Sequence, residues 1–328
     1  MNVCIIGAGS IGALKPNEYD SRFSENVLTH AHALYHFRKS KKINDFCIVE
    51  KNVKKLNSAK KKWKCQGYSG VIEIPFPMDI IVISVPTELH KNIFDDIFNL
   101  KTFPKIIICE KPFTDNYDQA LNIHKKCIEK DIKLVINYTR RFCPQIQSLK
   151  KRLEKEKINS CNIIYVRGLK RDACHAIDLC NYFFGDFKQG KILGSIQNSF
   201  NDYNFEDLTV PVWMEFERCR NVFLTPANGI NYSIFEIDIL TDNGRYSIID
   251  HSKKIKIFKK EKEKIYGSFN TMTYESIEDI SVEIENALLI LHGNCINYLK
   301  EKKENYDLFC TGLDGLKTQK ILSNLLGE

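Results

Sequence analysis

Short apolar runs alternate with helix-period stretches over the first 137 residues. The apolar runs are residues 3–6, 45–49, 80–85, 106–109 and 133–137, and the helical patterns between them include 52–64, 90–100 and 117–130. Apolar strands separated by helices are typical of βαβ units and a parallel sheet. The pattern predicts an α/β domain over residues 1–138.

The pattern changes near residue 139. Helical stretches at 144–156 and 174–184 alternate with β-rich segments at 162–166, 212–217, 221–224, 233–240, 246–249 and 255–259, and helical patterns follow at 280–300 and 314–326. Strands joined by turns such as Asp242-Asn243-Gly244 favour antiparallel pairing. Residues 139–328 are therefore predicted to form a second domain of α+β type with a largely antiparallel sheet.

The first apolar run breaks into a Gly-x-Gly-x-x-Gly motif at Gly7, Gly9 and Gly12, with Ser10 and Ile11 inside it. Gly7 is expected to make the turn, Gly9 to let the backbone approach a phosphate, and Gly12 to let a helix pack closely on the strand. Free N–H groups at the start of such a helix can hold a pyrophosphate. The motif predicts a dinucleotide site.

The second strand ends at Glu50, where this type of domain places an acid for the ribose hydroxyls. Glu50 lies nearly twice as far past the glycines as the usual spacing of about 20 residues. The excess predicts an insertion around the polar residues 15–22, after which a helical pattern resumes at 27–38. The insertion forms either part of the active-site rim or a surface loop.

Length, cysteine usage and charge narrow the function classes. A chain of 328 residues suits two domains. The 12 cysteines include no Cys-x-x-Cys pair, so we expect reduced thiols and no metal site. No apolar run approaches the roughly 20 residues that span a bilayer, and no signal peptide precedes the first strand, which predicts a soluble, cytoplasmic protein without a membrane partner.

The net charge of +7 comes mainly from lysine clusters without interleaved aromatic residues. Such clusters favour solvated faces over nucleic-acid binding, so no nucleic-acid partner is expected. A modest attraction of anionic substrates remains.

Polar segments follow three apolar runs at the edge where open α/β sheets bind ligands. They are Pro86-Thr87-Glu88-Leu89-His90, Glu110-Lys111-Pro112 and Asn137-Tyr138-Thr139-Arg140-Arg141-Phe142. Together with the glycine motif, they resemble the Gfo/Idh/MocA family of NAD(P)-dependent oxidoreductases over essentially the whole chain. The resemblance implies a Rossmann domain coupled to a domain whose open sheet often forms an oligomer interface, and hence a homodimer or homotetramer.

The resemblance also implies roles for individual residues. Lys111 is expected beside the nicotinamide and the substrate, where an ammonium group can relay a proton. The implied cofactor contacts are Gly7, Gly9, Ser10, Ile11, Gly12, Glu50, Pro86, Thr87, His90, Glu110 and Lys111. The implied substrate contacts are Lys111, Tyr138, Arg140, Arg171 and His175. Glu50 predicts NAD rather than NADP, because a carboxylate repels a 2′-phosphate.

The family's second catalytic element, Asp-x-x-x-His-x-x-Asp, corresponds to residues 171–178. His175 and Asp178 match it, whereas Arg171 occupies the position of the first aspartate and Asp172 is displaced by one. His175 is the second expected catalytic residue, since an imidazole accepts a proton near neutral pH. Asp172, also a catalytic candidate, either orients His175 or caps its helix. Arg171 and Lys170 either favour an anionic substrate or face solvent.

The resulting hypothesis is an NAD-dependent oxidoreductase that acts on a CH–OH group of a sugar or nucleotide sugar, such as one made for surface polysaccharide. Lys111 and His175 are expected to serve one site although they come from different domains. One alternative is a lyase, hydrolase or epimerase that oxidises its substrate transiently without net redox change. Another is a cofactor-binding regulatory protein without catalysis.

Overall fold

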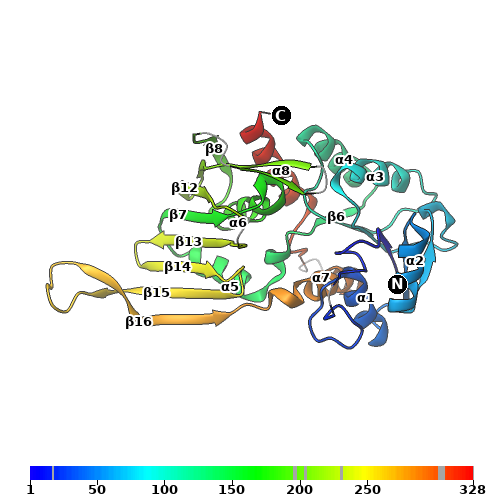
Figure 1. Cartoon of the computed structure of the whole chain (residues 1–328), viewed down its shortest axis with the longest axis horizontal. Coiled ribbons are helices and arrows are strands. Elements are labelled where there is room, and N and C mark those ends of the chain that lie inside the picture. Colours follow the sequence, from blue (N-terminus) through cyan, green and yellow to red (C-terminus); the bar gives the residue numbers. More distant parts are fainter. Residues whose placement is uncertain (17, 195–197, 203–204, 230–231, 302–306, 328) are drawn as a thin grey trace. The chain divides into compact units, whose positions relative to one another are not determined.

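The computed structural model describes residues 1–328 except 17, 195–197, 203–204, 230–231, 302–306 and 328 (Figure 1). The chain forms two compact units, one of Met1–Phe142 with Glu285–Gln319 and one of Cys143–Ile284 with Lys320–Glu328. The first unit thus extends four residues past the predicted boundary at 138 and also takes in a C-terminal segment. The prediction assigned that segment to the second domain.

A six-stranded parallel sheet forms the centre of the first unit, in the order β3-β2-β1-β4-β5-β6. Its strands are β1 Asn2–Ile6, β2 Asp45–Val49, β3 Gln66–Tyr68, β4 Ile80–Ile83, β5 Ile106–Cys109 and β6 Lys133–Ile136. The helices of residues 1–142 are α1 His30–Lys39, α2 Val53–Trp63, α3 His90–Phe98 and α4 Tyr117–Glu129, with short η1 Val71–Glu73, η2 Thr87–Leu89 and η3 Thr139–Phe142. The predicted parallel sheet is confirmed. The strands that follow β1 are added first on one side of it, as β2 and β3, and then on the other side, from β4 to β6. Such sheets bind ligands at this switch point between β1 and β4.

An excursion interrupts the first helix just after the glycine motif. Residues 9–14 make one turn, in which the amides of Ala13 and Leu14 both donate to the Gly9 carbonyl. The His30 amide then donates to the Ile11 carbonyl at 3.0 Å and the Ala31 amide to the Gly12 carbonyl at 2.9 Å. In an uninterrupted α-helix residue 15 would bond to Ile11. His30 therefore takes the place of residue 15, and residues 15–29 are looped out.

This excursion explains the unusual spacing to Glu50. Glu50 follows Gly12 by 38 positions, and removing the 15 inserted ones leaves 23, close to the usual spacing of about 20. The buried Asp20 anchors the insertion: it accepts hydrogen bonds from the Thr29 hydroxyl at 3.0 Å and the Lys15 amide at 3.2 Å, and it pairs with Lys62. The insertion is thus attached to α2 rather than loose, although its Asn17 lies outside the described residues.

Deleting residues 15–29 is expected to join Leu14 to His30 in helical register and to leave a folded protein that binds NAD within about threefold of wild type. The melting temperature should fall, because burial of Val27 against Ala33 and Leu288 contributes about 1.5 to 3 kcal/mol to the free energy of unfolding. Thermal unfolding and calorimetric titration with NAD measure both quantities. If the insertion forms the active-site rim, the Michaelis constant for substrate rises; wild-type kinetics would make it a surface loop.

A deletion of residues 15–27 is the matched control. It leaves two extra residues and rotates the rest of α1 by about 200° relative to the glycine turn. This control should lose both stability and NAD affinity. Equal behaviour of the two deletions would contradict the inferred register.

The second unit contains a mixed eight-stranded sheet in the order β16-β15-β14-β13-β7-β12-β11-β8. Its strands are β7 Ile158–Tyr165, β8 Phe187–Ile192, β11 Val212–Phe216, β12 Cys219–Pro226, β13 Glu236–Thr241, β14 Gly244–Ile249, β15 Lys254–Lys262 and β16 Asn270–Ser281. Among the described strands of this sheet, β7 and β12 are the one parallel pair and the other neighbours are antiparallel, so the predicted largely antiparallel sheet is confirmed. A separate hairpin consists of β9 Asn198–Asp202 and β10 Phe205–Thr209.

The remaining helices lie after residue 143. The second unit has α5 Pro144–Leu153 and α6 Cys174–Phe184, the latter preceded by η4 Gly168–Ala173. After η5 Ile284–Asn286 come α7 Ala287–Glu301 and α8 Gly312–Leu326. The helix predicted from residue 280 begins later, at Ala287, because residues up to Ser281 extend strand β16. Within the described part of the chain, we find no helix that is both long and apolar enough to span a bilayer.

Candidate active site

The three glycines of the motif have different surroundings in the turn after β1. Gly7 has φ +101°, and a Cβ there would lie 2.7 Å from the Ser84 carbonyl oxygen. A Cβ on Gly12 would lie 2.1 Å from the Gly7 carbonyl oxygen. A Cβ on Gly9 would meet no atom within 4 Å. Gly7 and Gly12 thus permit the close packing of the turn, whereas Gly9 leaves open space beside the backbone, as a bound pyrophosphate requires.

Glu50 lies directly beside this turn. Its Oε2 accepts a hydrogen bond from the Ala8 amide at 2.9 Å, and its Oε1 accepts one from the Asn52 amide at 2.9 Å. The side chain is half-buried. The insertion therefore does not displace the acid from the glycine motif. Open space at Gly9 with a carboxylate on the adjoining strand fits the phosphates and ribose of a dinucleotide.

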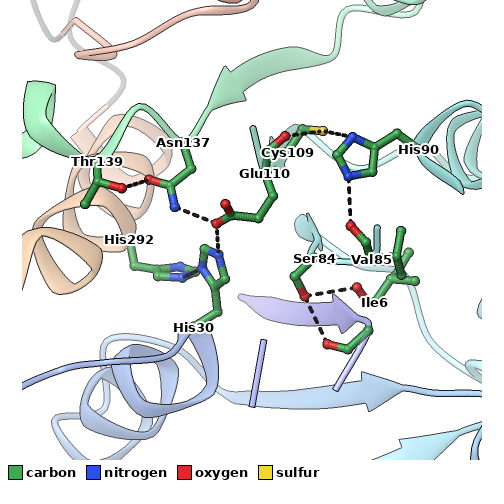
Figure 2. A network of polar contacts seen from close by, with 11 residues as sticks. Ile6, His30, Ser84, Val85, His90, Cys109, Glu110, Asn137, Thr139 and His292 are labelled. Atoms are coloured by element: carbon green, nitrogen blue, oxygen red, sulfur yellow. Dashed lines mark hydrogen bonds and ion pairs between the residues drawn. The ribbon is translucent and has the colours of Figure 1, made fainter. Parts of the chain in front are cut away.

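Glu110 follows β5 and is held by a buried polar network (Figure 2). The Asn137 side-chain amide donates to Glu110 Oε1 at 2.6 Å, and His30 Nε2 lies 2.9 Å from the same oxygen. His30 Nδ1 in turn lies 2.9 Å from His292 Nε2. A carboxylate oxygen only accepts hydrogen bonds, so His30 Nε2 donates to Glu110, while the donor between His30 Nδ1 and His292 Nε2 depends on the tautomers of the two rings.

Charge and burial support this arrangement. Burial alone would raise the pKa of Glu110, but the His30 hydrogen bond and charge, the Asn137 amide and the Lys111 ammonium outweigh it and lower that pKa. Burial, with the neighbouring His30, holds the pKa of His292 well below its usual range. At neutral pH Glu110 is therefore ionised and His292 is neutral.

The network fixes the backbone from which Lys111 extends. Glu110 is connected to α1 through His30, to the end of β6 through Asn137, and to α7 through His292 (Figure 2). Lys111 is half-buried and precedes a cis bond to Pro112. No sequence motif marks His30 or His292, since only the folded chain brings α1 and α7 together. Asn137 begins the segment Asn137–Phe142, for which the sequence predicted substrate contacts of Tyr138 and Arg140 but no role of Asn137.

His90 is buried inside the first unit. It has no exposed surface, and its Nδ1 and Nε2 lie 3.0 Å from the carbonyl oxygens of Phe113 and Val85, respectively (Figure 2). The ring therefore has no surface open to a ligand in this structure, and the expected cofactor contact of His90 stays a prediction. Through its two ring nitrogens, His90 connects the loop after β4 to the loop after β5. On the first of these loops, Pro86 is exposed and Thr87 half-buried.

The remaining candidates of the first unit follow β6. Tyr138 has 1% of its surface exposed, whereas Arg140 is half-buried. Arg141 donates to Asp314 Oδ1 at 2.8 Å. Arg140 thus has accessible surface for a substrate, and Tyr138 has almost none.

In the second unit, Arg171, Asp172 and His175 lie on the continuous helical segment η4–α6 and are all half-buried. Asp172 Oδ2 accepts a hydrogen bond from Arg167 Nε at 2.9 Å. This ion pair was not among the two roles expected for Asp172. Within the residues that the structure describes, no cluster of three or more His, Cys, Asp or Glu side chains could hold a metal ion.

Comparisons with known proteins agree with these features. Residues 1–138 match the family model described as "Oxidoreductase family, NAD-binding Rossmann fold". Inositol 2-dehydrogenase from Rhizobium meliloti is 20% identical over 213 residues, which cover 65% of this chain and 62% of that enzyme. The aligned part thus spans less than two thirds of this relative.

Two solved structures share the fold over nearly the whole chain. UDP-N-acetylglucosamine 3-dehydrogenase from Acidithiobacillus ferrooxidans has a TM-score of 0.74 at 16% identity, covering 99% of this chain and 96% of that one. The WlbA dehydrogenase from Bordetella pertussis, in complex with NADH and UDP-GlcNAcA, has a TM-score of 0.72 at 14% identity, covering 99% and 95%. Residues 1–138, less than half of the chain, thus match the NAD-binding Rossmann domain of the Gfo/Idh/MocA oxidoreductase family.

Proposed function

We propose that this protein is an oxidoreductase that transfers a hydride between NAD and a CH–OH group of a sugar or nucleotide sugar. The observation that carries the proposal is the pairing of open space at Gly9 with the Glu50 carboxylate at the Ala8 amide. Gly7, Ser10, Ile11 and Gly12 complete the turn that would hold the pyrophosphate. Pro86, Thr87 and Glu110 stay predicted cofactor contacts on the loops that follow β4 and β5.

Two side chains are proposed to act on the substrate. When bound, the nicotinamide supplies the hydride acceptor or donor. Lys111 Nζ would hold the substrate hydroxyl and relay its proton. The His175 imidazole would accept that proton during oxidation and return it during reduction. Asp172, paired with Arg167, would support this segment rather than react itself.

We expect an anionic substrate, because three basic side chains among the candidate substrate contacts are half-buried: Lys170, Arg171 and Arg140. Partly buried cations favour anionic ligands, such as the diphosphate of a nucleotide sugar or the carboxylate of a sugar acid. The name of the Acidithiobacillus relative specifies a UDP-sugar as its substrate. Assembly into a homodimer or homotetramer through the second unit's sheet stays a prediction, tested by light scattering.

A panel of inositols, sugar acids and UDP-sugars tests the reaction. One NADH formed per substrate oxidised supports the dehydrogenase. Product without net NADH change supports the lyase or epimerase alternative, and NAD binding without any turnover supports the regulatory alternative.

Glu50 is expected to determine the preference for NAD. Its charge would repel a 2′-phosphate about 4 Å away by roughly 1 kcal/mol in water and about 4 kcal/mol at an effective dielectric of 20. Glu50→Gln keeps one acceptor oxygen for either the Ala8 or the Asn52 amide and removes the charge. The ratio of the NADP to the NAD dissociation constant should therefore fall at least fivefold in calorimetric titrations. Glu129→Gln, an exposed acid at the end of α4, is the control and should leave the ratio unchanged. An unaltered ratio in Glu50→Gln would remove Glu50 from the ribose site.

A further inference from the structure

The helical segment η4–α6 begins without a cap from its own sequence. Arg167, the residue before it, has the left-handed conformation φ 58°, ψ 42°, and its side chain makes no capping hydrogen bond. The first amides of a helix have no acceptor within the helix and need one from elsewhere. Because this segment carries Arg171, Asp172 and His175, the group that caps it also affects the proposed site.

Side chains from β10 provide these acceptors. Asp207 Oδ1 accepts a hydrogen bond from the Lys170 amide at 2.9 Å, and Asp207 Oδ2 accepts one from the Arg171 amide at 2.7 Å. Thr209 Oγ1 accepts one from the Gly168 amide at 2.9 Å. Asp207 is 4% and Thr209 3% exposed. A buried carboxylate with one oxygen on each of two consecutive amides determines the direction in which that backbone runs.

The surrounding packing is specific for this contact. A Cβ on Gly168, which has φ +84°, would lie 2.1 Å from the Asp207 carboxyl group, so only glycine lets the carboxylate approach. The Tyr165 hydroxyl donates to the Val210 carbonyl at 2.7 Å and accepts from the Val210 amide at 2.8 Å. The last residue of β7 is thereby joined to the residue that follows β10.

Electrostatics favours an anion at this position. A negative charge at the start of a helix interacts favourably with the helix dipole. Burial raises the pKa of Asp207, while the amide hydrogen bonds from Lys170 and Arg171 and the charge of Lys170 act in the opposite direction. The donors thus offset part of the cost of burying the carboxylate.

We propose that Asp207 is a positioning residue for substrate recognition: by holding the amides of Lys170 and Arg171, it fixes the segment that presents Arg171 and His175. The inference rests on the proposed function for its kinetic consequence, but its structural part does not. Sequence patterns alone do not indicate it, because Asp207 follows Arg171 by 36 positions.

Hydrogen exchange of the full-length protein tests the structural part. In Asp207→Ala, exchange at the Lys170 and Arg171 amides should rise at least tenfold. Asp207→Asn, which keeps the shape and one acceptor, should show a smaller rise and serves if the alanine variant does not fold. Asp238→Asn is the matched control, since Asp238 is an ion-paired acid on β13 that bonds to Arg245 and Ser247. Unchanged protection in both Asp207 variants would overturn the proposal.

Kinetics with UDP-N-acetylglucosamine and NAD tests the positioning role. The Asp207 variants should lose at least tenfold in kcat/KM while the NAD dissociation constant stays within twofold. Asp238→Asn should keep the wild-type kcat/KM even if its melting temperature falls by as much as that of the Asp207 variants. If kcat/KM instead follows melting temperature in all variants, Asp207 is only structural and the proposal fails. If wild type turns over no sugar of the panel, the proposed function fails, and hydrogen exchange still decides whether Asp207 holds the segment.

Discussion

Replacing Gly9 with valine is expected to abolish measurable NAD binding while leaving the melting temperature within about 2 °C of wild type. A Cβ at this position meets no protein atom within 4 Å, so the side chain points into open space rather than into the fold. That space is where the phosphates would approach the backbone. Calorimetric titration with NAD and thermal unfolding followed by circular dichroism measure the two effects on the same sample.

Gly12→Ala is the matched control within the same motif. Its Cβ would lie 2.1 Å from the Gly7 carbonyl oxygen and 2.7 Å from Ser84 Oγ, so the turn itself must shift. This variant should lose stability together with NAD affinity. If Gly9→Val binds NAD as tightly as wild type, the motif only supports the packing of the turn.

Single alanine substitutions of Lys111 and His175 are each expected to lower kcat by about 10²- to 10⁴-fold, which corresponds to roughly 3 to 5 kcal/mol of barrier. If both residues serve the same proton transfer, the double variant should lose little more than either single one. The NAD dissociation constant should change little in His175→Ala, because His175 belongs to the second unit and the glycine turn to the first. Steady-state kinetics on a substrate from the panel measures these effects.

Lys125→Ala, at an exposed position of α4, is the control and should keep wild-type turnover. Fully multiplicative losses in the double variant would separate Lys111 and His175 into different steps. Wild-type turnover in His175→Ala would remove His175 from the reaction and favour a proton acceptor elsewhere.

Several predictions from sequence were local and proved accurate. The apolar runs at residues 3–6, 45–49 and 106–109 became strands, because such runs between polar segments have little alternative to burial in a parallel sheet. The predicted helix 174–184 has the same bounds as α6. The polar insertion could also be placed, since its composition breaks a helical pattern.

Contacts between residues far apart in the sequence could not be predicted from local patterns. The helix predicted from residue 280 begins at Ala287, since pairing with β15 extends β16 through Ser281. His90 belonged to a motif at the correct sheet edge, yet its ring is buried between two carbonyl groups. A motif specifies where the backbone runs, whereas the direction of each side chain depends on its neighbours in space.

The amino-acid sequence by itself determined the Rossmann domain, the glycine turn and the strand ends that carry Glu50 and Lys111. These follow from hydrophobic periodicity and from the backbone freedom of glycine, both of which act over a few residues. Only the tertiary structure decided that His30 and His292 hold Glu110 and that Asp207 caps the segment of Arg171 and His175. The physical reason is that buried donors and acceptors must find partners wherever the fold brings them close, regardless of their separation along the chain.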